Sequence, residues 1–216
     1  MARRADHDLK REVFAAAALR VIMRAGVGGL TVREVAKEAG FTTGALTHYF
    51  QSKDQVLIEA SEYSARLVRP RMEKKARASD ALGALKGVVD EALPITAAVR
   101  GYWRIWFGFW ERAAYNPAVA KVMRARYDEW RGRLAVLIRR AQGEGLAPSD
   151  VDADLASQEL VALVDGIAIQ VLLGTGRISA ARQREIIGAW IGLLAGGHVG
   201  RAGRPLGADP ASRAVG

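Results

Sequence analysis

Leu30-Thr-Val-Arg-Glu-Val-Ala-Lys-Glu-Ala-Gly40-Phe-Thr-Thr-Gly-Ala-Leu-Thr-His-Tyr-Phe50-Gln-Ser-Lys53 is the stretch that decides the fold of this chain. Thr31 and Glu34 form a capping box, in which the threonine hydroxyl accepts a backbone N–H bond and the glutamate reaches back to the cap. Gly40 suits the left-handed conformation that ends many helices. The stretch therefore predicts a short helix, a tight glycine turn and a second short helix.

The second short helix is predicted to turn a polar face outward. Thr42 is its expected N-cap, and Leu46 and Phe50 are expected to face inward. The outward residues are mostly small, which lets a helix approach the edges of DNA bases: Thr43, Gly44, Thr47 and His48. Ser52 and Gln55 predict another capping box, so the next helix begins at once. Its first turn contains Lys53, and a lysine beside a helix N-terminus suits phosphate binding.

This order of helices resembles the N-terminal domain of the TetR family of transcriptional regulators, most specifically over residues 40–53. Thr47 departs from the pattern, because many members carry tyrosine there. The resemblance implies DNA binding, with bases facing Thr42, Thr43, Gly44 and Thr47. It implies phosphate contacts from Thr31, Thr47, His48, Tyr49 and Lys53. In place of a bulky aromatic residue, the hydroxyl groups of Thr42, Thr43 and Thr47 are expected to determine sequence specificity.

The charge of the chain agrees with a polyanionic partner but does not identify one. Its 216 residues carry a formal net charge of +9, with a pI near 10.2. The first 53 residues hold nine Lys/Arg and five Asp/Glu, so they account for only part of the excess. Cysteine is absent, which excludes disulfides and thiolate metal sites and fits a reducing cytoplasm.

Other functional classes find little support in the sequence. It contains no His/Cys/Asp cluster with metal-ligand spacing, no Walker loop and no nucleophile elbow, so we expect no enzyme, no catalytic residue, no metal and no cofactor. No apolar run reaches the roughly 20 residues needed to cross a bilayer, because Asp165 and Gln170 interrupt the best candidate. We therefore expect a cytoplasmic protein without a membrane partner. The rival hypothesis is a ligand-binding helical protein that has lost DNA binding.

The whole chain is predicted to be all-α. We expect a DNA-binding domain over residues 1–53, a helical effector-binding and dimerisation domain over 54–196, and a disordered tail over 197–216. Helices are predicted over 6–25, 52–76, 79–93, 101–115, 116–143, 152–173 and 179–194, besides the two short ones. In the first helix, an apolar stripe is expected to pack on the short helices, through Leu9, Val13, Ala16, Ala17, Leu19 or Arg20, and Met23.

The body contains a helical face made almost entirely of aromatic rings. Trp103, Trp106, Phe107 and Trp110 recur at i, i+3, i+4 and i+7, and the next helix offers a similar apolar row. Periodicity leaves a packed core and a ligand cavity both open, and the resemblance favours the cavity. The candidate effector-binding residues are Tyr63, Trp103, Trp106, Phe107, Trp110, Met123, Tyr127 and Trp130. Such rings suit an apolar, aromatic or cationic small molecule.

The body also resembles the choline-responsive branch of the family, through its Trp-rich segment ahead of a helix that begins with Asn116 and Pro117. That resemblance makes choline one candidate effector among many small molecules. Asp165 lies within the next apolar helix, where it is either a structural carboxylate or a polar group of the pocket.

Residues 161–173 are too apolar for a surface helix with one buried stripe. A four-helix bundle formed by two helices from each of two chains would cover them, as in the family's usual dimer. The candidate interface residues are Leu160, Val164, Ile167, Val171, Ile187, Trp190 and Ile191. We therefore expect a homodimer on a palindromic DNA operator, most simply a repressor that a ligand releases. An activator remains open.

Overall fold

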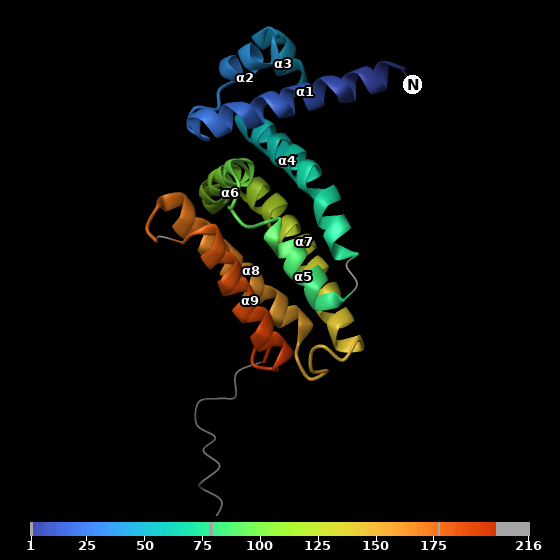
Figure 1. Cartoon of the computed structure of the whole chain (residues 1–216). Helices are drawn as coiled ribbons and strands as arrows, with labels where there is room; N and C mark the ends of the chain where they lie inside the picture. Colours follow the sequence, from blue (N-terminus) through green and yellow to red (C-terminus); the bar gives the residue numbers. More distant parts are fainter. Residues whose placement is uncertain (1, 78–79, 177, 202–216) are drawn as a thin grey trace, which may run out of the picture.

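The computed structural model describes residues 2–77, 80–176 and 178–201, and these residues form helices without any strand. The helices are α1 (Ala2–Ala25), α2 (Val32–Ala39), α3 (Thr43–Tyr49), α4 (Lys53–Ala76), α5 (Ala81–Asp90), α6 (Ala97–Tyr115), α7 (Pro117–Gly143), α8 (Ala153–Leu173) and α9 (Ala180–Ala195). The predicted all-α class is confirmed. Figure 1 shows α1, α2 and α3 as a head at one end, with α4 running from this head into a body made of α5 to α9.

Side-chain caps determine where the helices of the head begin. The hydroxyl oxygens of Thr31, Thr42 and Ser52 accept hydrogen bonds from backbone N–H groups three residues later, at 3.1, 3.2 and 3.2 Å. Gly40 follows α2 with a φ of 76°, in the left-handed region. Each cap satisfies a backbone group that the helix itself leaves without a partner. The predicted N-caps and the glycine turn are confirmed, but among the described residues Glu34 does not return a hydrogen bond to Thr31.

The core of the head uses the predicted face of α1 only in part. Leu9 is 61% exposed and Val13 is also exposed, so the expected stripe is wrong at these two positions, whereas Ala17 and Leu19 are buried and Met23 packs against the core. Phe14 is fully buried instead, with its ring centroid 5.1 Å from that of Phe41 and 6.2 Å from that of Phe50. Because α1 is apolar on more than one side, the face with the largest ring determines which side packs inward.

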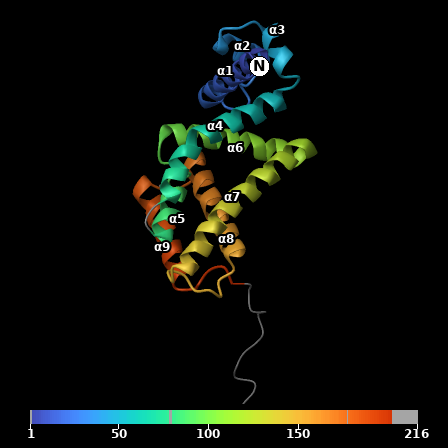
Figure 2. The ribbon, with the colours of Figure 1, turned by 90° about the vertical axis from the view of Figure 1, so that its right-hand side faces the viewer.

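Helix α6 joins the body to the head. Figure 2 shows it lying across the molecule directly below the head. A Cβ atom added at Gly108 would lie 2.2 Å from Cγ2 of Val27, and one added at Gly101 would lie 2.7 Å from the Met23 side chain. Arg104 also donates a hydrogen bond to the Met23 carbonyl at 2.8 Å. The two glycines therefore let α6 approach the end of α1 and the turn after it.

The hydrophobic cores do not divide at the predicted boundary after residue 53. The core of the head includes Val56, Leu57 and Ala60 from the first turns of α4. It also includes residues from the body helices α6 and α7: Ile105, Phe109, Val119 and Met123. A second core joins α5, α7, α8 and α9. Head and body are thus continuous through α4, α6 and α7, and a movement of these helices reaches both.

The segment after α9 packs on the body as far as the structure describes it. The carbonyl of Gly200 accepts a hydrogen bond from the Asp152 N–H at 2.9 Å, and Arg201 forms an ion pair with Asp150 at 2.9 Å. Val199 is half-buried against the body core. The disordered tail predicted from residue 197 is therefore wrong for residues 197–201, and residues 202–216 lie outside the described part of the chain.

Helix α8 is the one described helix that length and composition alone would allow to cross a membrane, a test that core helices of soluble proteins also pass. Here Leu160, Val164 and Ile167 are buried in the core that α8 shares with α7 and α9. Packing within the chain therefore accounts for the apolar residues on this side of α8.

Candidate functional site

Helix α3 presents the outward face that the sequence predicts. Leu46 is fully buried and holds α3 on the head, whereas Thr43, Gly44, Thr47 and His48 are exposed. A Cβ atom added at Gly44 would meet only the Thr42 hydroxyl, at 3.9 Å. Packing within the head therefore does not require a glycine there, and its outer side is open to a partner.

The threonine hydroxyl groups of this face differ in their hydrogen bonds. Thr42 caps α3 by accepting from the Ala45 N–H at 3.2 Å, and Thr47 donates to the Gly44 carbonyl at 3.0 Å. Each of these hydroxyls retains either its proton or its lone pairs for a further contact. The Thr43 hydroxyl makes no hydrogen bond within the described residues, so both its donor and its acceptor capacity are available. Thr43 is the strongest candidate of the three for contacting a base.

The candidate phosphate contacts surround this face. Thr31 and Lys53 are exposed at the starts of α2 and α4, where helix N-termini favour anions. His48 is exposed as well. Tyr49 is half-buried, because its ring packs against His7 and Phe14 with centroid distances of 4.6 and 5.4 Å. Of the predicted contacts, Tyr49 thus has the least side-chain surface free.

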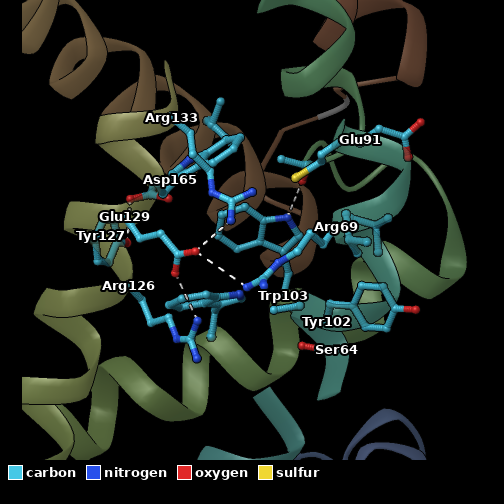
Figure 3. Close-up of a pocket in the computed structure, with 18 residues that line it drawn as sticks. Ser64, Arg69, Glu91, Tyr102, Trp103, Arg126, Tyr127, Glu129, Arg133 and Asp165 are labelled. Carbon is cyan, nitrogen blue, oxygen red and sulfur yellow. Dashed lines mark hydrogen bonds and ion pairs between the residues drawn. The ribbon is translucent and has the colours of Figure 1, made fainter. Parts of the chain in front are cut away.

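The body encloses a cavity of about 180 Å³ between α4, α6, α7 and α8. Figure 3 shows rings and charged groups converging on it from these helices. Four of the predicted effector-binding residues line the cavity: Trp103, Trp106, Tyr127 and Trp130. The indole N–H of Trp103 donates to the Ala92 carbonyl at 2.8 Å, which fixes the orientation of that ring. The aromatic face of α6 therefore serves as a cavity wall as well as a packed surface.

The structure does not bring the other four predicted residues to the cavity wall. Trp110 stands behind it and donates to the Tyr127 hydroxyl at 3.1 Å, and the Phe107 ring packs on Trp110 at 5.0 Å. Met123 is buried in the core of the head, and Tyr63 packs against that core. Phe107, Trp110 and Met123 share helix faces with the lining residues, but they lie toward the end where α6 and α7 meet. The two helices separate from there (Figure 2), so that only the farther part of each face reaches the cavity.

Asp165 is a polar group of the cavity that is also held in place by the fold. Its carboxylate lines the cavity and accepts a hydrogen bond from the Tyr127 hydroxyl at 2.7 Å. Burial raises the pKa of Asp165 to about 6, and burial together with the Asp165 charge raises the pKa of Tyr127. Asp165 is therefore both a structural carboxylate and a polar group of the pocket, the two possibilities that the sequence left open.

Sequence reasoning missed the charged residues of the cavity. Arg126, Glu129 and Arg133 line it from α7, and Arg69 lines it from α4. The signal was available, because these residues of α7 recur at i, i+3 and i+7 beside Tyr127 and Trp130. Charged residues at helical spacing usually form a solvated surface, which is why the pattern did not stand out.

A polar cluster joins the first turn of α4 to the bend between α6 and α7. Arg112 donates to the two carboxylate oxygens of Asp54 at 2.9 and 2.8 Å, and the Asn116 amide donates to Asp54 at 2.9 Å. The bond from Arg112 holds the pKa of Asp54 below its usual value. Asn116 also caps α7 by accepting from the Ala118 N–H at 3.0 Å. The cluster adjoins Lys53 and thus connects the body to a candidate phosphate contact.

Most of the predicted dimer-interface residues face the core of their own chain. Val171 is half-buried. The other six are buried without any partner chain: Leu160, Val164, Ile167, Ile187, Trp190 and Ile191. This correction follows from α8 packing on α7 and α9, which covers the side that a second chain was expected to cover. The outward sides of α8 and α9 carry small and apolar residues instead, among them Ala162, Leu173, Ala189, Gly192 and Leu193.

Comparison with protein families gives two matches that together span most of the helical chain. The family described as bacterial regulatory proteins of the tetR family matches residues 15–60. The C-terminal domain described as that of BetI-type transcriptional repressors matches residues 81–196. The first match covers the second part of α1, both short helices and the first turns of α4, and the second covers the body from α5 to the end of α9.

Individual proteins agree with these matches. The chain is 30% identical over 189 residues to the HTH-type transcriptional regulator PksA of Bacillus subtilis, covering 87% of this chain and 90% of that protein. It is 27% identical to the regulator BetI of Stenotrophomonas maltophilia, covering 88% and 95%. A transcriptional regulator from Saccharomonospora viridis, solved in complex with choline, superimposes with a TM-score of 0.77 at 30% identity, covering 84% and 95%.

Proposed function

The chain belongs to the TetR family of bacterial transcriptional regulators and is a DNA-binding regulator, and from this premise we propose a homodimeric repressor that a small cationic molecule releases from a palindromic operator. The observation that carries this proposal is the double role of α6. One side of α6 supplies Trp103 and Trp106 to the cavity, and another packs on the head through Gly101 and Gly108. Occupation of the cavity therefore acts on the helix that supports the DNA-reading head.

A quaternary ammonium ion is the effector chemistry that the cavity supports best. Five aromatic side chains line it, and the faces of Trp and Tyr rings attract cations by about 0.5–2 kcal/mol each, most strongly when water is excluded. Asp165 adds a half-buried carboxylate that gains a counter-ion when a cation binds. The Saccharomonospora viridis regulator, which superimposes on this chain, was solved with choline, a molecule of this kind. Choline is accordingly the first compound to test.

We infer that two heads related by a two-fold axis read successive major grooves, about 34–36 Å apart. The α3 face then enters the groove with Thr43 and Gly44, while Lys53 and Thr31 bind phosphates. Ligand binding moves α6 and α4, and with them the spacing of the two heads. A coupling free energy of about 1–3 kcal/mol would weaken operator binding roughly 5–150-fold.

The proposal is tested by selecting bound sequences from random double-stranded DNA and then adding choline to the complex. We expect an approximately palindromic sequence and weaker binding in the presence of choline. If no DNA is retained at low salt, the protein is instead a ligand-binding relative without DNA-binding function. If choline strengthens binding, the proposed direction of regulation is wrong.

The same binding assay separates phosphate contacts from base contacts. Lys53→Ala is expected to weaken binding to all sequences about equally and to reduce the slope of log affinity against log salt by about one unit. Thr43→Val removes the free hydroxyl and keeps the shape, so it should change the preferred bases and leave the salt slope unaltered. The same effect from both variants would contradict this division of roles.

Light scattering at micromolar concentration is expected to give the mass of a dimer. We propose that the outward sides of α8 and α9 form the contact, because Gly188 and Gly192 leave room for a close helix approach and Leu193 is exposed beside them. Leu193→Glu should shift the protein toward the monomer mass. Val136→Glu, which also replaces an exposed apolar side chain but on α7, should not. A monomeric mass for the unaltered protein would refute the dimer.

A further inference from the structure

We propose that the effector is a zwitterion, in which the quaternary ammonium is joined to a carboxylate or phosphate that binds Arg69, Arg126 and Arg133. This inference rests on the proposed effector site and specifies its ligand class. A cation alone, such as choline, would occupy the aromatic part of the cavity and leave these three guanidinium groups without a ligand partner.

The three arginines gather around one carboxylate. Arg133 Nη2 lies 2.8 Å from Glu129 Oε1, Arg126 Nη1 lies 3.2 Å from Glu129 Oε2, and Arg69 Nη2 lies 3.6 Å from Glu129 Oε1. Figure 3 shows the three groups directed toward the Glu129 carboxylate from different sides. Arg126 also forms an ion pair with Glu62. The cluster thus holds three positive charges and two negative ones.

This cluster has hydrogen-bonding capacity for an anion. Each guanidinium group carries five N–H donors, and one carboxylate accepts about four hydrogen bonds. Arg69 approaches Glu129 only to 3.6 Å, beyond hydrogen-bonding distance, and it makes no other ion pair among the described residues. A ligand carboxylate or phosphate would supply oxygens at this point and would match the planar guanidinium geometry.

The cation and anion sites lie in different parts of the same cavity. Trp103 is buried, and Asp165 lines the cavity where it accepts the part-buried hydrogen bond from Tyr127, so the aromatic part is the deeper part of the cavity. The side chains of Arg69, Arg133 and Glu129 are 41%, 38% and 41% exposed, which places them at the cavity opening, and Arg126, at 18%, lies deeper beside them. A zwitterion entering with its ammonium group first would bring its anionic group to the cluster.

A bare cation meets unfavourable charge at this opening. The excess positive charge of the arginines disfavours an ammonium ion that passes them, and nothing in choline compensates for that repulsion. An anionic group on the same molecule reverses the sign of the interaction. The cavity therefore discriminates between ligands with the same ammonium group by what is attached to it.

Calorimetric titration of the full-length protein, without DNA, tests this inference. The compounds are choline, glycine betaine, carnitine and phosphocholine, which share the trimethylammonium group and differ in the anion and its spacing. We expect at least one zwitterion to bind about tenfold or more tightly than choline, as a charged hydrogen bond typically provides. Because the unaltered protein is used, this comparison does not depend on the folding of any variant.

Variants identify the residues responsible. Arg69→Gln and Arg133→Gln should each weaken the best zwitterion about tenfold and leave choline unchanged or slightly tighter. Arg124→Gln is the matched control, because Arg124 is exposed on the same helix as Arg133 and does not line the cavity. Circular dichroism checks that each variant is folded.

Three results would overturn the inference: choline binding as tightly as every zwitterion, equal losses for choline and the zwitterion in the arginine variants, or no binding by any of the four compounds. The first two leave the proposed function intact, since choline would still bind and its effect on the operator complex is measured separately. Failure of operator binding itself would refute the proposed function without affecting the titration.

Discussion

Replacing Gly108 with alanine is expected to destabilise the folded protein by about 1–3 kcal/mol, the usual cost of inserting a methyl group into a packed contact. The added Cβ atom would lie 2.2 Å from Cγ2 and 2.8 Å from Cβ of Val27, in the turn after α1. A branched side chain near its own backbone has little freedom to move away. Either α6 or the turn must shift, and both belong to the junction between the cavity and the head.

The matched control is Gly132→Ala on α7. A Cβ atom added there meets nothing within 4 Å, and the position is exposed, so the change should stabilise the helix by up to about 1 kcal/mol. Relative to the unaltered protein, we therefore expect a lower Tm for Gly108→Ala and an equal or higher Tm for Gly132→Ala. Equal midpoints would show that α6 does not pack this closely on the turn.

The Gly108 variant also tests how the ligand signal reaches DNA. If α6 transmits it, a shifted junction should change operator affinity in the absence of ligand and reduce the further change on adding ligand. Binding of the ligand to the cavity should change less, because Gly108 faces Val27 and does not line the cavity. If the ligand changes operator affinity as much in this variant as in the unaltered protein, although the Tm is lower, α4 and not α6 transmits the signal.

Several helix starts were predictable because the groups that set them are local. The start of α6 was predicted wrongly at residue 101, because the helix begins at Ala97 with Thr96 as its cap. Thr31, Thr42 and Ser52 each accept a hydrogen bond from a residue three positions later, so a short segment contains the whole interaction. The same holds for Asn116, which caps α7 ahead of Pro117. Such signals do not depend on the remainder of the fold.

The choice of packing faces was less predictable. The pattern in α1 allowed a face through Leu9 as well as one through Phe14, and contacts with Phe41 and Phe50 decided between them. In α8, the apolar composition indicated that the helix would be covered. It did not distinguish a second chain from α7 and α9 of the same chain, since both remove the same surface from water.

The aromatic residues of the cavity were predictable from the sequence, whereas its charged residues were not. Trp103 and Trp106 stand out because large rings on one helix face are rare, whereas Arg126 and Arg133 look like any charged pair on a surface helix. Only the approach of α4 brings Arg69 to the same Glu129 and converts that surface into part of a cavity. Long-range pairing of this kind has no local signal in the sequence.

Asp165→Asn is expected to change the pH dependence of stability. Burial raises the pKa of Asp165 from 3.8 to about 6, so the folded protein binds the proton more tightly than the unfolded chain. Proton binding at Asp165 therefore adds to the free energy of unfolding. This contribution is fully present below about pH 4 and is lost as the pH rises through 6. At about 1.4 kcal/mol per pKa unit, the loss is about 3 kcal/mol. Asparagine retains an acceptor for the Tyr127 hydroxyl and does not ionise.

Urea unfolding between pH 4 and 8 measures this effect. The unaltered protein should lose stability relative to Asp165→Asn as the pH rises from 4 to 7, whereas Asp128→Asn, at an exposed carboxylate on α7, should follow the unaltered protein. Other titrating groups contribute equally to the protein and its variant and cancel in the difference. A constant difference across this range would mean that Asp165 is not buried in solution.

The same ionisation should govern ligand binding. A quaternary ammonium group does not titrate, so if it binds against ionised Asp165, its affinity should be constant above about pH 7 and fall about tenfold per pH unit below pH 6. The other carboxylates of the cavity, Glu91 and Glu129, already have arginine partners. In Asp165→Asn the affinity should be weaker and independent of pH. A pH-independent affinity in the unaltered protein would place the cation elsewhere. Ionised Asp165 destabilises the empty cavity, so part of the affinity for a cation arises from relieving that cost.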